Sequence, residues 1–181
     1  MLTMIAGVAH LEMRFHRVIL LPQCLSVIRA ESHKARGVET GGPLVGYVGN
    51  DGALVVADAT GPGPRARLEH YSVTIDGKYA QEFCDRVNRE SNGHIDYVGD
   101  WHKHPGFSLR PSEHDVDAMK TMAQFPFSPT RHPISLIYRM WPRSLRVYVW
   151  DGSGVLADIT PTTRVERRCC CQKEKVPRKK T

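Results

Sequence analysis

Residues 99–105 read Gly-Asp-Trp-His-Lys-His-Pro, and residues 111–115 read Pro-Ser-Glu-His-Asp. One residue separates His102 from His104, and ten residues separate His104 from Asp115. Imidazole nitrogens and carboxylates are ligands that zinc prefers, and three protein ligands leave the fourth tetrahedral position to water. Structural zinc is normally closed by four protein ligands, so this spacing predicts one catalytic Zn²⁺ per chain and a metal-dependent hydrolase.

The predicted secondary structure brings the three ligands together. Residues 95–102 have the pattern of a strand, and side chains two apart on an extended chain share a face, so His102 and His104 project together. Ser112 stands at the N-cap position of the following helix. This places Asp115 in the first helical turn, where the helix dipole favours a carboxylate. We therefore expect the ligands to meet at the end of the strand.

The elements around this motif predict an α/β (α+β) fold in a single domain. Residues 60–72, rich in Gly and Pro, cannot continue a sheet and are predicted to form a loop. The order of elements predicts one curved mixed sheet of about six strands flanked by about three helices. The helices are expected at 22–34, at 76–90 and from 112 onward, and the first strands at 13–20, 38–48 and 53–59.

The net charge of +6 comes from one end of the chain. Residues 164–181 hold eight of the 25 basic and two of the 19 acidic residues, which leaves 17 of each sign in residues 1–163. A balanced body gives little electrostatic reason to bind phosphates, so we expect no nucleic-acid partner. The predicted organisation is an N-terminal extension at 1–12, a domain at 13–163, and a basic, cysteine-containing, disordered tail at 164–181.

The cysteines indicate a reducing compartment. Cys24 and Cys84 fall in apolar helical contexts typical of buried free thiols, and the consecutive cysteines at 169–171 cannot form a spaced disulfide framework. No stretch approaches the roughly 18 apolar residues of a membrane span, and the apolar start of the chain lacks the basic region of a signal peptide. We expect a cytoplasmic protein with no membrane partner.

A catalytic metal site also needs a general base that does not bind the metal. Glu39, just before a glycine pair, is the candidate. Together, ETGGPLVGY at 39–47, HKHP at 102–105 and SEHD at 112–115 resemble the JAMM (MPN-plus, JAB) zinc metalloprotease family. That family shows a distant glutamate, then His-x-His-Pro, then Ser-x-x-Asp. The resemblance implies an MPN/JAB-like domain with a cytidine-deaminase-like layout.

The resemblance also implies a role for each matching residue. His102, His104 and Asp115 would bind zinc, Glu39 would deprotonate the water and protonate the leaving amine, and Ser112 would donate a hydrogen bond to the oxyanion. The implied reaction is hydrolysis of an amide or isopeptide bond. Taken singly, each residue also has a purely structural interpretation, such as a helix N-cap for Ser112, and only the combination points to a site.

The sequences of these motifs most resemble those of bacterial JAB deconjugating peptidases, which are encoded beside ubiquitin-like conjugation enzymes, as in type II CBASS and related anti-phage operons. This resemblance implies a deubiquitinase-like zinc isopeptidase. Its substrate would be the C-terminus of a ubiquitin-like protein or of a conjugated target protein, and its partners would be E1/E2-like enzymes of the same operon. The expected role is to reverse or process conjugation in antiviral defence.

Three alternatives remain open: a metal-free scaffold of the same fold, a nucleic-acid-associated protein similar to the RadC family, and a peptidase that processes sulfur carriers. Three further residues are candidates. Asp100 shares a strand face with His102 and is expected to accept its second N–H, although a carboxylate at the sheet edge explains it equally well. Arg65 and Arg67 are candidates for substrate binding, and a solvated loop is the alternative.

Overall fold

The computed structural model describes residues 15–152 and 156–165, so the expected extension at 1–12 and nearly all of the expected tail lie outside the described residues. An eight-stranded mixed sheet has the order β10-β1-β3-β2-β6-β7-β8-β9, and β4 pairs with β5 in a separate ribbon. The strands are β1 (Arg17–Leu20), β2 (Thr40–Val48), β3 (Ala53–Ala59), β4 (Arg67–Leu68), β5 (Val73–Thr74), β6 (Asp96–Lys103), β7 (Ile134–Arg139), β8 (Ser144–Trp150), β9 (Leu156–Asp158) and β10 (Thr163–Val165).

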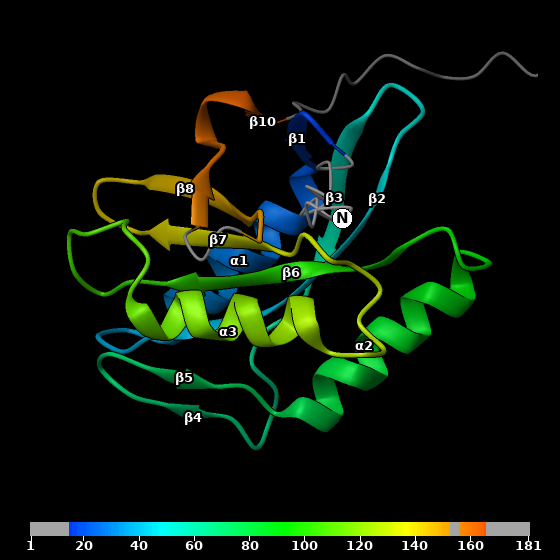
Figure 1. The fold of residues 1–181 in the computed structure, drawn as a ribbon. Helices are drawn as coiled ribbons and strands as arrows, with labels where there is room; N and C mark the ends of the chain where they lie inside the picture. Colours follow the sequence, from blue (N-terminus) through cyan, green and yellow to red (C-terminus); the bar gives the residue numbers. More distant parts are fainter. Residues whose placement is uncertain (1–14, 153–155, 166–181) are drawn as a thin grey trace, which may run out of the picture.

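Three helices cover the two faces of the sheet (Figure 1). Helix α1 (Pro22–Lys34) packs on one face, and α2 (Gly77–Glu90) and α3 (Glu113–Gln124) pack on the other. A 3₁₀ turn at Thr160–Thr162 leads into β10. The prediction of a mixed α/β domain is confirmed. No helix in the described part of the chain is both long and apolar enough to cross a membrane.

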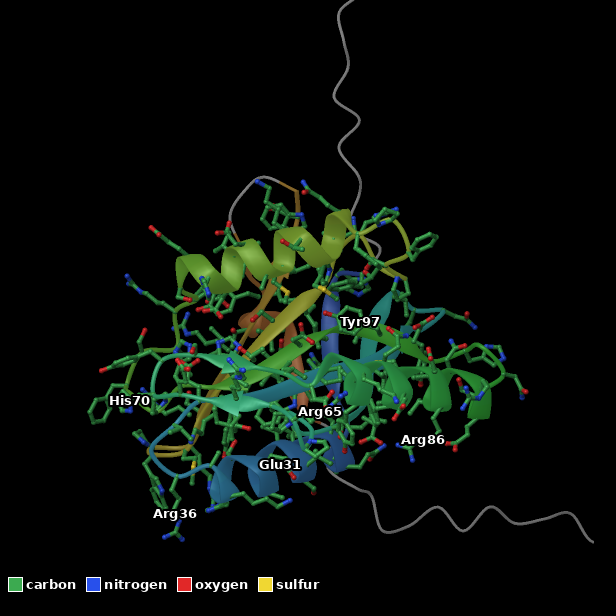
Figure 2. All side chains as sticks on the ribbon, turned by 90° about the horizontal axis from the view of Figure 1, so that it is seen from below. Glu31, Arg36, Arg65, His70, Arg86 and Tyr97 are labelled. Atoms are coloured by element: carbon green, nitrogen blue, oxygen red, sulfur yellow. The ribbon has the colours of Figure 1, made fainter. Side chains whose placement is uncertain are left out.

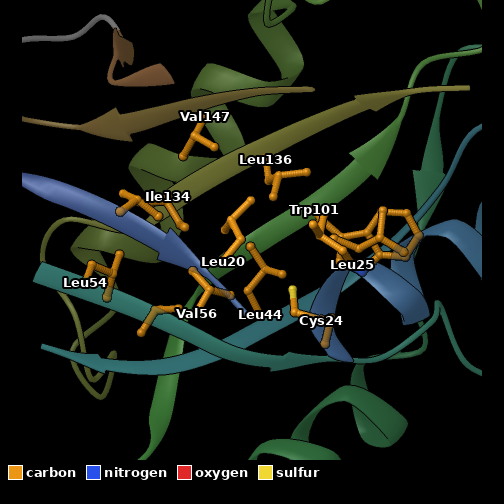
Figure 3. Packing of buried hydrophobic residues seen from close by; sticks show 14 of the residues in the cluster. Leu20, Cys24, Leu25, Leu44, Leu54, Val56, Trp101, Ile134, Leu136 and Val147 are labelled. Atoms are coloured by element: carbon orange, nitrogen blue, oxygen red, sulfur yellow. The ribbon is translucent and has the colours of Figure 1, made fainter. Parts of the chain in front are cut away.

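Helix α1 follows directly from its sequence. Pro22 occupies the first turn, where the missing N–H costs no hydrogen bond. Cys24, Leu25 and Ile28 are buried at helical spacing against the sheet. Figure 3 shows Cys24 and Leu25 beside Trp101 of β6 in the main core. The predicted bounds of this helix are confirmed.

Two parts of the sheet differ from expectation. The segment at 60–72, predicted to be a loop, contains β4. This strand pairs with β5 in an antiparallel register, with Arg67 opposite Thr74. Strand β10 pairs in parallel with β1, and it includes Arg164 and Val165, which the charge distribution assigned to the tail. With β10, the main sheet has eight strands, where about six were expected, and β4 and β5 form a separate ribbon.

Strand β6 lies near the middle of the sheet, antiparallel to β2 and parallel to β7. The glycines of β2 allow this contact to be close. A Cβ at Gly41 would lie 2.4 Å from the backbone oxygen of Trp101, and one at Gly42 would lie 2.1 Å from that of Thr60. The Thr60 oxygen also accepts a hydrogen bond from the Trp101 indole at 2.9 Å. The glycine pair after Glu39 therefore fixes how β2 sits on the strand that carries the histidines.

Candidate metal centre

The end of β6 and the start of α3 bring the three predicted ligands together. His102 Nε2 lies 3.0 Å from His104 Nε2 and 3.4 Å from Asp115 Oδ1, and all three ligand atoms lie within 4.8 Å of one another. Zinc bonds of about 2.0–2.1 Å at tetrahedral angles put ligand atoms about 3.3 Å apart. The donor set and its spacing therefore fit a zinc ion.

The histidines are held with their Nε2 atoms toward this centre. His104 Nδ1 lies 2.9 Å from the backbone oxygen of Ser108, which favours the tautomer that leaves Nε2 free for a metal. His102 is buried, and burial lowers its pKa below the usual range, although Asp115 opposes this shift. Neutral imidazole is the form that binds metals, so burial favours the ligating state.

Asp115 is positioned by the cap of its own helix. Ser112 Oγ donates to Asp115 Oδ2 at 2.7 Å, and the backbone N–H of Ser112 donates to the same oxygen at 2.6 Å. In return, the Asp115 backbone N–H donates to Ser112 Oγ at 3.3 Å, which completes a capping box. Oδ2 is therefore used by the cap, while Oδ1 faces His102.

Glu39 lies beside the three ligands. Its Oε1 is 3.9 Å from His104 Nε2, and its side chain is only 13% exposed. Burial raises the pKa of the Glu39 carboxyl, and the positive charge that His104 can carry opposes this rise. The backbone N–H of Glu39 donates to the Glu69 oxygen at 2.7 Å, which ties this position to the ribbon of β4 and β5. A carboxylate held here can exchange protons with a water at the centre.

The structure does not bring Asp100 to His102. Asp100 accepts a hydrogen bond from the Tyr97 hydroxyl at 3.0 Å, and no hydrogen bond joins it to His102 within the described residues. Burial raises the pKa of Asp100 to about 6. The residue shares the predicted strand face, but its carboxylate is turned to a different partner.

Arg65 is engaged in the fold. Its guanidinium forms two bonds to the Asp76 carboxylate, at 2.8 and 3.0 Å, and Asp76 also caps α2 by accepting from the Tyr79 N–H. The side chain therefore fastens the loop to the helix, and it is 68% exposed. Arg67 is exposed on β4.

The ribbon supplies residues that the sequence reasoning missed. Tyr71, Ser72 and Val73 line a pocket of about 140 Å³ together with Glu39, His102, Ser112 and Asp115. The alternation of apolar and polar residues from Tyr71 to Ile75 was the available signal, because it is typical of a strand and not of a loop.

Comparison with known proteins gives the family. The model for prokaryotic homologs of the JAB domain matches residues 21–150. The chain belongs to this family. All three ligands of the metal group, together with Glu39 and Ser112, lie inside the matched region of this JAB-domain protein.

A curated relative and a solved structure agree with this assignment. A probable metalloprotease of Sinorhizobium fredii is 28% identical over 141 residues, which cover 75% of this chain and 84% of the relative. The solution structure of a Desulfitobacterium hafniense protein has the same fold, with a TM-score of 0.60 and 16% identity over 82% of this chain and 92% of that one. The family and the metalloprotease relative support a peptidase-like hydrolase with a metal cofactor.

Proposed function

We propose that this JAB-domain protein is a JAMM-type zinc isopeptidase that cleaves the amide bond after the C-terminus of a ubiquitin-like protein or of a conjugated target. One observation carries the proposal: Glu39 stands 3.9 Å from His104, next to a three-ligand group that it does not join. A scaffold needs neither an open metal position nor a largely buried carboxylate beside it.

Each residue of the site has a separate role in the proposed hydrolysis. When bound, zinc would polarise the scissile carbonyl and lower the pKa of a water. Glu39 would accept the proton of the attacking water and deliver it to the leaving nitrogen, and its raised pKa suits a group that both takes and returns a proton. Ser112 would donate to the carbonyl oxygen that becomes negative, for which its hydroxyl proton must turn away from Asp115.

The substrate class rests on the resemblance of the motifs to deconjugating peptidases and on the size of the site. The pocket beside the ligands has a volume of about 140 Å³. Such a narrow space suits the small residues of an extended C-terminal tail. Within the proposal, E1/E2-like enzymes of the same operon supply the conjugates, and cleavage reverses or processes them in cytoplasmic antiviral defence.

The decisive experiment measures product masses. A ubiquitin-like protein from the same operon, fused through its C-terminus to a reporter, is incubated with the zinc-loaded enzyme, and the masses locate the cleaved bond. We expect Glu39→Gln to lower the rate by about 10²–10⁴-fold while zinc content is unchanged. Glu90→Gln, the same change at an exposed site on α2, is expected to cleave normally.

The outcomes separate the alternatives. Zinc binding without cleavage of any fusion, or equal cleavage by the Glu39→Gln protein, would contradict the proposal and favour a scaffold. Cleavage confined to sulfur-carrier fusions would assign the protein to cofactor synthesis. DNA binding that is weakened by salt and survives removal of residues 166–181 would favour a RadC-like role.

A further inference from the structure

A second pocket adjoins the metal centre on the side of His104. It has a volume of about 500 Å³ and is lined by His33, Arg36, Gly37, Lys103, His104, Pro105, Arg139, Met140 and Trp141. We call it the basic pocket, because three of these residues are Lys or Arg and none carries a carboxylate. The lining therefore carries excess positive charge, in contrast to the even charge of residues 1–163 as a whole, and Glu39 lies outside the lining, 3.9 Å from His104.

The backbone around Arg36 is held in place, while its guanidinium remains exposed. The residue before it, Ala35, accepts a hydrogen bond from the buried Lys103 ammonium, and the oxygen of Gly37 lies 2.8 Å from His70 Nδ1. The backbone is thus anchored on both sides of Arg36. Within the described residues, no hydrogen bond or ion pair engages the guanidinium, and Figure 2 shows it extending from the end of α1 on the same side as His70.

The rest of the pocket is also fixed. Arg139 donates to the backbone oxygens of Phe107 and Pro142, at 2.5 and 3.1 Å, which holds its guanidinium at the wall. Lys103 is 2% exposed, and its ammonium is held by the backbone oxygen of Ala35. Trp141 is 71% exposed and offers an aromatic face. Arg139 and Lys103 are preorganised and lose little freedom when an anion binds, while Arg36 supplies an exposed guanidinium.

We propose that the basic pocket binds an acidic side chain of the substrate, on the amine side of the cleaved bond. This inference rests on the proposed function for its place in the reaction. Glu39, which would protonate the leaving nitrogen, has its Oε1 3.9 Å from His104 Nε2, and His104 lines the basic pocket. Ser112 and Asp115, on the carbonyl side, line the smaller pocket, which Glu39 also lines, and neither of them reaches the basic pocket. In this proposal the released component extends past His104 toward Arg36, which lines the same pocket.

Binding is measured first, because it does not depend on cleavage. The probes are the peptide Gly-Glu-Glu-Gly-Glu, with both ends blocked, and its glutamine and lysine counterparts. Of the three tryptophans, Trp101 and Trp150 are buried, so fluorescence quenching or shifts report mainly on Trp141. We expect the glutamate peptide to bind about tenfold more tightly than the glutamine peptide, and this margin to shrink with salt.

Matched charge reversals locate the binding. Arg36→Glu is expected to abolish the preference for glutamate, whereas Arg29→Glu, also exposed on α1 but outside the basic pocket, should keep it. Equal binding of the glutamate and glutamine peptides overturns the inference. So does an Arg36-dependent preference for single-stranded oligothymidylate over the glutamate peptide, which would make the pocket a phosphate site.

The kinetic arm tests the position in the reaction. Fusions with two glutamates, glutamines or lysines directly after the cleaved bond are compared by kcat/KM. We expect the glutamate fusion to be cleaved about tenfold faster than the lysine fusion, and Arg36→Glu to remove the difference. Equal cleavage of all three overturns the inference and leaves the proposed function standing. Cleavage of none, with Arg36-dependent peptide binding, rejects the proposed function and the amine-side placement together.

Discussion

Ser112 and Asp115 form a reciprocal pair in which one carboxylate serves two purposes. Oδ2 of Asp115 accepts from the Ser112 hydroxyl and backbone N–H, and Oδ1 lies 3.4 Å from His102 Nε2. The hydrogen bonds that start helix α3 therefore also set the direction in which the third ligand points. In the motif Ser-x-x-Asp, helix capping therefore orients the carboxylate that would bind the metal.

This link predicts the behaviour of Ser112→Ala. Loss of the cap should lower the free energy of unfolding by about 1 kcal/mol. Because Asp115 also loses an orienting hydrogen bond, zinc affinity should fall by about 10–100-fold. Ser112→Thr keeps the hydroxyl and serves as the control in urea titrations and competition with a chelator. Normal zinc affinity in the alanine variant would show that the cap does not orient the ligand.

Zinc binding should stabilise the folded protein. Zinc at about a hundredfold excess over its Kd contributes about 2.7 kcal/mol, which corresponds to a rise of about 5–10 °C in Tm for a chain of this size. Treatment with a chelator should reverse the rise. His104→Ala should abolish it, whereas His114→Ala, an exposed position on α3 outside the ligand group, should retain it. An equal rise in the His104→Ala protein would place the ion elsewhere.

The burial of Asp100 predicts that replacing this residue stabilises the folded protein, by an amount that depends on pH. Its pKa is about 6 in the folded protein, above the usual 3.8, so the folded state binds the proton more tightly than the unfolded state. Its contribution to stability is present below pH 4 and is lost as pH rises through 6. Asp100→Asn should therefore be more stable than the wild type by up to about 3 kcal/mol above pH 7, with little gain at pH 4. Reduced zinc content in this variant would instead restore Asp100 as a partner of His102.

The ion pair of Arg65 and Asp76 predicts that folding stability depends on pH in the opposite direction. Hydrogen bonds from Arg65 hold the pKa of Asp76 at about 2, below the usual 3.8, so the unfolded state takes up the proton first as pH falls. The stabilisation is present above pH 4 and is lost between about pH 4 and pH 2. Urea midpoints measured across this window should fall less steeply in Arg65→Gln than in the wild type. Parallel slopes would mean that the pair does not contribute to acid stability.

Local sequence patterns predicted elements such as α1, in which buried side chains recur at regular spacing along the chain. Pro22 and the helical spacing after it predicted α1, and the geometry of the strand predicted at 95–102 correctly put His102 and His104 together. The spacing of Ser112 and Asp115 predicted their cap, because such bonds span only three residues.

Relationships between distant segments could not be predicted in this way. Whether Arg65 meets a substrate or Asp76 depends on how a loop folds back onto α2, and no periodicity encodes that return. Lys103 is expected at the surface from its residue type, yet it is 2% exposed because the oxygen of Ala35 satisfies its ammonium. The parallel pairing of β10 with β1 likewise joins the two ends of the described chain.

The central place of β6 in the sheet has a consequence for how the metal would leave. His102 and His104 lie at the end of a strand held on both sides, while Asp115 sits in the first turn of a surface helix. The two histidines can move away from the site only when the strands of the sheet separate. The first turn of a helix, in contrast, frays readily. We expect metal exchange to follow the unwinding of the first turn of α3. Amide protons at Asp115 and Val116 should therefore exchange with solvent far sooner than those of β6, and added metal should slow them selectively.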